Sequence, residues 1–373
     1  MRYTDFKDKK LSLLGMGCMR FPQEGEGWGM PIIHDKAQEV IDQCMAKGIN
    51  YYDTAYIYHH GESETFLGEA MKKYPRDSYY IADKYSMNAE PDFKKQFATQ
   101  LERLQTDYID FYLLHAVGDN TIDKYITNGC IEYFEELRAE GKIKHLGFSF
   151  HGSSDALRKM TARHNWDFAM IQLNYFDWWH CGHDDFYHHL REKNIPIMIM
   201  EPVHGGLLAN LTEEGNKMLK DAQPDKSIAS WAMRFFLDLP GIAVVNSGMS
   251  SMEQAIDNLE TFSNDEPLSA EEKEILKKAS TMLYESIAAK CTACKYCVPH
   301  CPMGIDIPYQ LTTYNNYKTG GGEWRLNRLT VLPEDKQPGA CIHCGVCRTH
   351  CPQDLDIPAL MTEMDGILDK LKG

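Results

Sequence analysis

Eight short apolar runs, separated by amphipathic stretches, constrain the fold of this chain more than any other feature. Many of these runs are almost continuous in apolar residues, as expected for parallel strands that are buried on both faces. Helical patterns lie between them, for example at 35–47, 92–104, 128–140, 154–164, 228–237 and 251–262. The predicted strands are Leu13–Met19, Ile49–Ala55, Tyr79–Lys84, Ile109–Ala116, Ile143–Phe150, Phe168–Tyr175, Ile195–Pro202 and Ile242–Gly248.

Eight strand–helix units within about 250 residues are typical of a (β/α)8 TIM barrel, which is an α/β fold. A doubly wound open sheet is the alternative that the same alternation allows, but the number of units and the length favour the barrel. A further helix is predicted after the barrel, because Ser269 and two glutamates open an amphipathic stretch. We therefore expect a barrel at 1–265, a connecting helix at 266–290 and a small, mainly helical domain at 291–373.

The last part of the chain contains a repeated cysteine pattern, C-x2-C-x2-C-x3-C followed by proline, and each copy continues into an Asp-Ile-Pro phrase. In this spacing, three thiolates of one copy bind one 4Fe-4S cluster, and the fourth reaches the other cluster. Two 4Fe-4S clusters are therefore the predicted cofactors. The predicted ligands are Cys291, Cys294, Cys297 and Cys351 for one cluster, and Cys341, Cys344, Cys347 and Cys301 for the other.

Zinc and disulfides are the alternatives for these cysteines. Structural zinc sites use well-separated cysteine pairs rather than three cysteines in seven residues, so zinc is disfavoured. Disulfides are rare in a reducing compartment. The tail resembles the two-cluster bacterial ferredoxins, and we expect a ferredoxin-like domain. The other four cysteines, Cys18, Cys44, Cys130 and Cys181, are expected to be buried apolar fillers.

The charge and hydropathy of the chain exclude several classes of protein. The formal net charge is −15 and no basic stripe is present, which argues against nucleic-acid binding. No apolar run is long enough to span a membrane. The first ten residues lack the apolar segment of a signal peptide. We expect a cytoplasmic protein that acts on a small-molecule substrate.

Four polar residues lie at the ends of successive predicted strands, where enzymes with this barrel place their active sites. Asp53, Lys84 and His115 end the second, third and fourth strands, and Tyr58 follows Asp53 by five residues. Tyr58 could protonate a carbonyl oxygen, helped by the Lys84 ammonium that Asp53 holds, while His115 orients that oxygen. Each residue alone has a structural interpretation, such as a strand-end cap or a core histidine, but their convergence favours catalysis.

These residues resemble the catalytic tetrad of the aldo-keto reductase family. The resemblance covers about residues 10–262 and includes Asp53-Thr-Ala55, Gly61-Glu-Ser-Glu64 and Gln172-Leu-Asn-Tyr175. It implies NAD(P)H-dependent carbonyl reduction, with Asp53, Tyr58, Lys84 and His115 as the catalytic residues. It also implies cofactor contacts at Ser149 and Gln172 for the nicotinamide amide, and at Gly205, Gly206, Ser247, Gly248 and Asn258 near the phosphates.

Three departures from the family pattern bear on the cofactor. Phe150 replaces the usual Asn after Ser149, Met200 stands where an aromatic residue often stacks on nicotinamide, and no basic residue follows Gly248 as far as Asn258. A 2′-phosphate would lack a charged partner there, so NADH is favoured over NADPH. Clusters pass single electrons whereas nicotinamide passes a hydride, and flavin joins such carriers. FMN is therefore an alternative occupant of the barrel.

Three functions fit the combined pattern. The first is a reductase for a carbonyl-type or conjugated small molecule, with electrons exchanged through the clusters and with a ferredoxin or flavoprotein as redox partner. The second is an electron-transfer module whose barrel is a docking scaffold. The third is an NAD(P)H carbonyl reductase with structural clusters. His151 and His204 are candidates to line the pocket, and the aromatic, histidine-rich stretch at 175–189 is interpreted as a rim loop rather than a metal site.

Overall fold

The computed structural model describes residues 1–25, 30–119, 121–287, 289–291, 297–318, 323–351 and 353–372. The chain divides into two compact units. The first unit contains Met1–His204 and Met218–Lys277, and the second contains Gly205–Lys217 and Lys278–Gly373.

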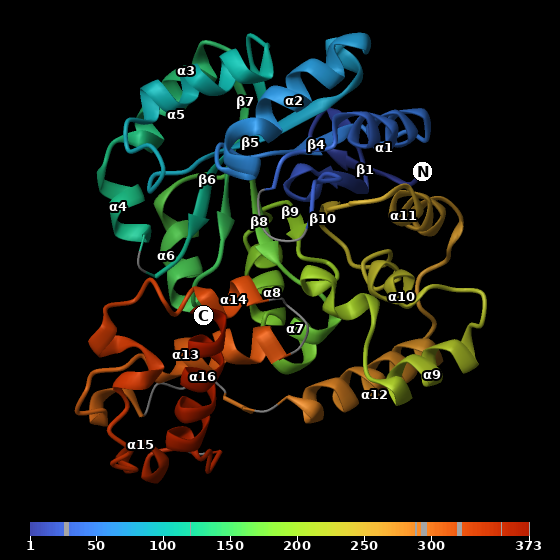
Figure 1. Ribbon diagram of the computed structural model, residues 1–373. Helices are drawn as coiled ribbons and strands as arrows, with labels where there is room; N and C mark the ends of the chain where they lie inside the picture. Colours follow the sequence, from blue (N-terminus) through green and yellow to red (C-terminus); the bar gives the residue numbers. More distant parts are fainter. Residues whose placement is uncertain are drawn as a thin grey trace. The chain divides into compact units, whose positions relative to one another are not determined.

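Eight parallel strands of the first unit form a closed barrel in the order β10-β3-β4-β5-β6-β7-β8-β9 (Figure 1). All eight predicted strands are confirmed, and so is the barrel. The interior between them is filled by large apolar side chains such as Tyr51, Phe111 and Met198. The strands are β3 (Leu14–Gly17), β4 (Tyr51–Asp53), β5 (Tyr80–Tyr85), β6 (Ile109–Val117), β7 (Ile143–Phe150), β8 (Phe168–Gln172), β9 (Ile197–Met200) and β10 (Ile242–Ser247).

Helices follow the strands, as the amphipathic pattern predicts. Several begin at a polar cap: the Asp92 side chain accepts hydrogen bonds from Lys94 N and Lys95 N, and Ser251 accepts one from Gln254 N. Such caps satisfy backbone N–H groups that have no partner within the helix. The helices up to residue 286 are α1 (His34–Ala46), α2 (Glu62–Ala70), α3 (Phe93–Leu104), α4 (Ile122–Thr127), α5 (Cys130–Ala139), α6 (Ser154–Arg163), α7 (Tyr175–His180), α8 (Asp184–Glu192), α9 (Glu213–Ala222), α10 (Ile228–Arg234), α11 (Met252–Asn264) and α12 (Ala270–Ser286).

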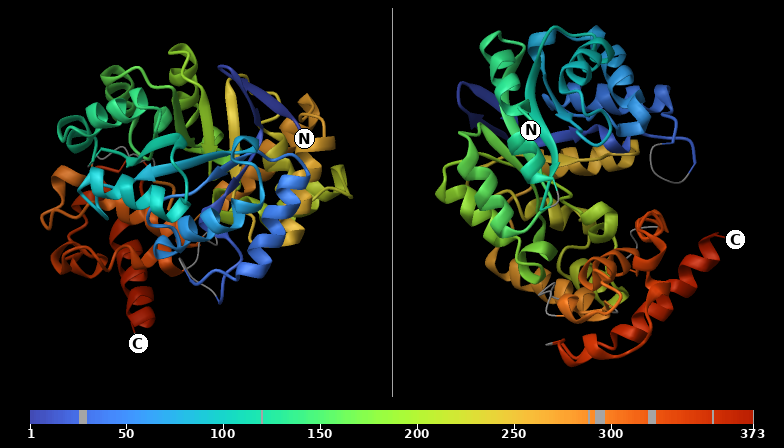
Figure 2. Two further views of the ribbon diagram at one scale, coloured as in Figure 1. Left: turned by 90° about the horizontal axis from the view of Figure 1, so that it is seen from above. Right: turned by 90° about the vertical axis from the view of Figure 1, so that its left-hand side faces the viewer.

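An antiparallel hairpin, β1 (Tyr3–Phe6) and β2 (Lys9–Ser12), precedes the barrel and was not predicted (dark blue in Figure 2). Its charged turn hides the strand pattern in the sequence. Phe6 is buried and packs edge-on against Phe111 and His145, with ring centroids 5.2 and 5.0 Å away. The hairpin therefore covers the end of the barrel at which the strands begin and leaves their carboxyl ends for a functional site.

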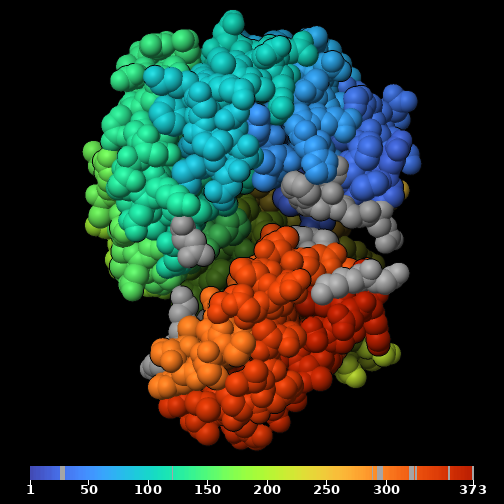
Figure 3. All heavy atoms as spheres, turned by 60° about the vertical axis from the view of Figure 1, so that its left-hand side comes forward, coloured from blue at the N-terminus to red at the C-terminus, as the bar shows by residue number. Residues whose placement is uncertain are grey.

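The second unit is mainly helical, as predicted, and most of its residues form the orange and red body in Figure 3. Each repeated Asp-Ile-Pro phrase begins a helix: Asp306 accepts a hydrogen bond from Tyr309 N, and Asp356 accepts one from Ala359 N. Apolar residues of both helices, including Leu311 and Met361, form one core. The helices are α13 (Ile307–Asn316), α14 (Glu323–Asn327), α15 (Val346–Thr349) and α16 (Ile357–Lys372). Among the described helices of either unit, none is long and apolar enough to cross a membrane.

Candidate functional site

The structure brings the four predicted tetrad residues together at the carboxyl ends of neighbouring strands. Asp53 ends β4, Lys84 and His115 lie near the ends of β5 and β6, and Tyr58 begins a short 3-10 helix (Tyr58–Gly61). Lys84 Nζ donates to Asp53 Oδ1 at 2.5 Å, to Thr54 O at 2.6 Å and to the Tyr58 hydroxyl at 3.3 Å. The Tyr58 and His115 rings meet edge-on with centroids 6.0 Å apart.

Burial and the Lys84 charge set the protonation states of this group. Burial raises the pKa of Asp53, and the adjacent Lys84 opposes that shift. Burial acts to lower the pKa of Lys84, but Asp53 and Tyr58 outweigh it and hold the pKa above its ordinary value. Burial raises the pKa of Tyr58, and Lys84 acts to lower it, as expected, without cancelling the effect of burial. Tyr58 is therefore a neutral phenol near pH 7, with its hydroxyl proton in place.

His115 is held by a residue that sequence reasoning missed. Ser86 Oγ lies 2.6 Å from His115 Nδ1, and the Tyr125 hydroxyl donates to His115 O at 2.7 Å. Burial has the largest effect on the pKa of His115, and the charges of Lys84 and His151 add to it. Together they lower this pKa well below its usual value, so the His115 ring is neutral near pH 7. Ser86 follows Lys84 by two residues, and residues two apart in a strand point to the same face. The two-residue spacing of Lys84 and Ser86 is therefore the sequence signal that could have placed Ser86 beside the tetrad.

Two further buried acids, Asp83 of β5 and Glu64 of α2, lie close together. Asp83 directly precedes Lys84, so its side chain points to the opposite face of the strand. Glu64 Oε2 accepts a hydrogen bond from Arg103 at 2.7 Å, and Glu64 Oε1 accepts one from Gln100 at 3.2 Å. Burial, together with the nearby Glu64 carboxyl, raises the pKa of Asp83 well above its usual range. Asp83 is therefore a buried acid that tends to keep its proton while Glu64 pairs with Arg103.

The residues predicted to contact a cofactor in the barrel lie at strand ends. Ser149 in β7 is buried, and its hydroxyl accepts a hydrogen bond from Ala116 N at 2.8 Å. Gln172 is the last residue of β8 and pairs with Met200 of β9. Gln172 Nε2 donates to Asp177 Oδ2 at 2.9 Å.

The predicted phosphate-contacting residues fall into two groups. Ser247 and Asn258 are buried neighbours, since Asn258 Nδ2 donates to Ser247 Oγ at 3.0 Å. Gly248 lies against Arg20, because a Cβ added at Gly248 would be 2.9 Å from Arg20 Cβ. Arg20 is a cation at this strand end that sequence reasoning missed. Gly205 and Gly206 belong to the second unit and have φ values of 68° and 107°, which strongly favour glycine.

The other histidine candidates are dispersed. His204 is buried with its Nδ1 atom 3.3 Å from Asp177 Oδ1, whereas His151 is exposed. In the aromatic stretch, Trp178 packs against Tyr187 and His188, with ring centroids 5.2 and 5.6 Å away. Among the described residues of this histidine-rich stretch, no three His, Cys, Asp or Glu side chains form a group that could hold a metal ion.

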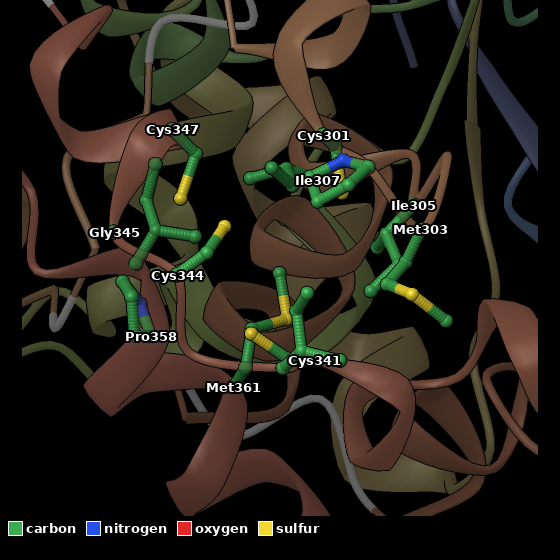
Figure 4. A pocket seen from close by; sticks show the side chains of 13 residues that line it. Cys301, Met303, Ile305, Ile307, Cys341, Cys344, Gly345, Cys347, Pro358 and Met361 are labelled. Carbon is green, nitrogen blue, oxygen red and sulfur yellow. The ribbon is translucent and has the colours of Figure 1, made fainter.

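Four of the repeat cysteines line one pocket of the second unit. This pocket contains about 360 Å³ of empty space, part of which is open to solvent, and Ile305, Ile307, Ile357 and Met361 form much of its apolar wall. The Cys344 and Cys347 sulfurs point toward the same space (Figure 4). Burial raises the pKa of Cys347, and the thiols of Cys341, Cys344 and Cys301 act in the same direction. The cysteines in this pocket are Cys301, Cys341, Cys344 and Cys347.

This pocket joins one cysteine of the first repeat to three of the second, which is the grouping that the spacing predicts. Of the other predicted set, Cys297 is buried, Cys291 and Cys351 are half-buried, and Cys294 lies outside the described residues. The residues directly before Cys301 and Cys351 also meet: the His300 and His350 rings stack with centroids 3.6 Å apart and an angle of 7°. The two copies are thus in contact at equivalent positions.

The four cysteines outside the repeat differ from expectation in one case. Cys18, Cys44 and Cys130 are buried, as predicted for apolar fillers. Cys181 is exposed, so the prediction is wrong for this residue. Cys181 directly follows the last residue of α7, where the chain turns through Gly182 at the surface.

Comparisons with known proteins agree with this geometry. The model of the aldo/keto reductase family matches residues 13–281, and a 4Fe-4S dicluster domain matches residues 290–355. An uncharacterized oxidoreductase of Bacillus subtilis, YqkF, is 28% identical over 68% of this chain and 88% of its own length. The NADH-specific methylglyoxal reductase of Escherichia coli is 26% identical over 54% of this chain and 66% of its own length.

A solved structure supports the same assignment. The aldo-keto reductase AKR11C1 from Bacillus halodurans, in its holo form, is 30% identical, has a TM-score of 0.62, and is aligned over 75% of this chain and 96% of its own. The chain belongs to the aldo/keto reductase family. It is an oxidoreductase whose barrel domain is followed by a 4Fe-4S dicluster domain.

Proposed function

We propose that the barrel reduces a carbonyl-type or conjugated small molecule and exchanges electrons with two 4Fe-4S clusters in the C-terminal domain. The functional division is the barrel at 1–265, the connecting helix at 266–290 and the cluster domain at 291–373. The single observation that carries the proposal is the Lys84 ammonium, which bonds to the Asp53 carboxylate and the Tyr58 hydroxyl at once. That arrangement is suited to delivering a proton to a substrate oxygen.

The tetrad residues have separate roles in this proposal. Tyr58 donates its hydroxyl proton to the substrate oxygen, and the Lys84 ammonium stabilises the phenolate that remains. Asp53 keeps Lys84 charged and in place. Ser86 Oγ lies within hydrogen-bond distance of His115 Nδ1. We assign the Ser86 hydroxyl as the donor of this bond, so that the neutral ring carries its proton on Nε2, where it can donate to the same substrate oxygen.

Nicotinamide is the proposed cofactor of the barrel, and when bound it would supply the hydride. Ser149 and Gln172 would hold its carboxamide, and their polar side chains at the ends of β7 and β8 suit that group. Gly205, Gly206, Ser247, Gly248 and Asn258 would lie near its phosphates. NADH is proposed over NADPH because no basic residue follows Gly248 as far as Asn258 in the sequence, and Arg20 is the cation that lies beside Gly248 in its place. Arg20 beside Gly248 is a candidate partner for a phosphate oxygen.

The second unit suits iron–sulfur clusters. An apolar pocket lined by four cysteines, with Cys347 buried, provides soft thiolate ligands and an apolar wall on one side of the cluster. We propose that Cys301, Cys341, Cys344 and Cys347 bind one cluster, and that Cys291, Cys294, Cys297 and Cys351 bind the other. A ferredoxin or flavoprotein is the proposed redox partner.

An anaerobic titration tests the proposal. NADH and then NADPH are added to the full chain carrying its clusters, and the visible absorption of the clusters is followed together with oxidation of the dinucleotide. Bleaching of the clusters supports electron exchange with the barrel. Carbonyl reduction without any bleaching would favour a reductase with structural clusters. Cluster reduction by a partner protein, with no turnover of carbonyl compounds, would favour an electron-transfer module.

The flavin alternative has its own measurement. A one-electron carrier and a hydride donor exchange electrons readily through FMN. Protein purified anaerobically and denatured would release flavin with its characteristic fluorescence if FMN occupied the barrel. Flavin-free protein that still bleaches its clusters with NADH would remove this alternative.

A further inference from the structure

A buried carboxyl group, outside the tetrad, lies beside one of the proposed cofactor contacts. Asp177 is 1% exposed and lies in α7, shortly after β8. Its Oδ2 atom accepts hydrogen bonds from Gln172 Nε2 at 2.9 Å and Asn174 Nδ2 at 2.7 Å. His204 Nδ1 lies 3.3 Å from Oδ1, and His183 Nδ1 lies 3.8 Å from Oδ2. These groups offset the cost of burying an ionised carboxylate.

The charge on Asp177 determines which way the Gln172 amide faces. Burial acts to raise the pKa of Asp177, but His204, His183 and Gln172 outweigh it and hold the pKa well below its usual range. A carboxylate only accepts hydrogen bonds, so it takes the amino end of the Gln172 amide. The carbonyl end, Oε1, is then left, and no hydrogen bond from any described residue reaches it.

The side chain of Asn174 fixes the position of the Asp177 carboxylate beside Gln172. Asn174 Oδ1 accepts from Asp177 N at 2.8 Å, while Asn174 Nδ2 also donates to Glu201 O at 3.1 Å. The side chain of Asn174 is therefore fully engaged and fixes the start of α7. Asp177 is anchored from both its backbone and its side chain.

We infer that Asp177 is a positioning residue, which holds Gln172 with Oε1 free to accept a hydrogen bond from the carboxamide N–H of a nicotinamide ring. The pair thereby selects a ring substituent that donates a hydrogen bond. This inference rests on the proposed function, because it requires nicotinamide beside Gln172. It adds a specificity determinant that does not touch the cofactor itself.

A pair of dinucleotides tests the inference. NAD+ has a carboxamide, whereas 3-acetylpyridine adenine dinucleotide keeps the carbonyl but replaces the amino group with a methyl group. Dissociation constants of both are measured on the full chain with its clusters, under anaerobic conditions. One hydrogen bond corresponds to an about 3- to 10-fold preference for NAD+ in the wild type.

Asp177→Asn is the diagnostic variant, since its amide can face Gln172 with either end. We expect the preference for NAD+ to fall to about twofold or less. Asp185→Asn, which removes a partly exposed carboxylate of α8 that pairs with Arg158, is the matched control and should keep the wild-type preference. A role in folding alone would weaken both dinucleotides equally and leave their ratio unchanged.

The outcomes separate the two levels of the proposal. A wild type that binds neither dinucleotide overturns the proposed function, and this inference with it. A wild-type preference that Asp177→Asn retains in full overturns only the role of Asp177. If Asp177→Asn does not fold, Asp177→Glu replaces it: a reduced preference at unchanged affinity for the acetylpyridine dinucleotide supports the inference, and an unchanged preference refutes it. Gln172→Met then checks that Gln172 makes the contact, and a preference that it leaves unchanged also refutes the inference.

Discussion

Replacing Lys84 with methionine should destabilise the barrel severely, because it leaves a buried carboxylate without its cation. The side chains of Lys84 and Asp53 are only 2% and 7% exposed, and they are 2.5 Å apart. Lys84 provides the hydrogen bond to Asp53 Oδ1, and Oδ2 has no hydrogen-bond partner among the described residues. Breaking a buried ion pair from one side costs about 3–5 kcal/mol.

The loss of stability in Lys84→Met should also depend on pH, because the unpaired Asp53 carboxyl can take up a proton. Without Lys84, burial alone acts on Asp53, so its pKa in the folded variant rises further above the unfolded value. The folded state then binds a proton that the unfolded state has lost. Stability of Lys84→Met should therefore fall as pH rises above about 4, by up to about 1.4 kcal/mol per pH unit, until the folded pKa is passed.

Urea unfolding followed by tryptophan fluorescence, at several pH values under anaerobic conditions, measures both effects. The double variant Lys84→Met/Asp53→Asn is the control, because it removes the stranded charge. It should be less destabilised than the two single variants combined, by about 1–3 kcal/mol. A single variant within about 1 kcal/mol of wild type and with the same pH dependence would refute this account of the pair.

Four further predictions follow from the described contacts. Tyr58→Phe removes the proposed acid and should lower kcat for carbonyl reduction by about 10²- to 10⁴-fold in steady-state assays, with the iron content unchanged. Ser86→Ala frees His115 and should lower kcat/KM by about tenfold, while Ser86→Thr keeps the hydroxyl and most of the activity. Cys301→Ser should remove about half of the bound iron, as measured by iron analysis and electron paramagnetic resonance, because Cys301 of the first repeat is a proposed ligand of the cluster that the second repeat holds. The control variant Cys181→Ser should remove none. Asp83 keeps a proton in the folded state, so wild-type stability should fall as pH rises from about 4 toward its raised pKa, and Asp83→Asn should flatten that slope in the same unfolding assay.

The barrel and the tetrad were accessible from the sequence because both depend on local patterns. Each strand is a nearly continuous apolar run, and the carboxyl ends of parallel strands must lie at one end of a barrel. Asp53, Lys84 and His115 could therefore be grouped from the sequence alone. The placement of Cys301 in one pocket with Cys341, Cys344 and Cys347 was accessible for a similar reason, since the spacing within each repeat specifies which thiol is left for the other copy.

The unpredicted features depend on contacts between distant segments. Arg20 reaches Gly248 only because the first and last strands of the barrel are neighbours. Asp177 lies close to Gln172 in the sequence, but the partner that offsets its burial, His204, follows the next strand, and no local pattern signals that the short helix has a buried acid. The N-terminal hairpin was missed because its charged turn breaks the alternation that marks a strand.

The closure of the barrel has a consequence for how the protein is made. β10 pairs with β3 through Val245 and Leu14, so β3 and β9 each keep an unpaired edge until the ribosome has synthesised β10. At ordinary rates of translation, β3 waits roughly 10–45 seconds for that partner. Exposed strand edges pair readily with other chains. A chain whose synthesis ends after β9 and before β10 would therefore be prone to aggregation. Chaperones that cover nascent strands should raise the yield of this protein.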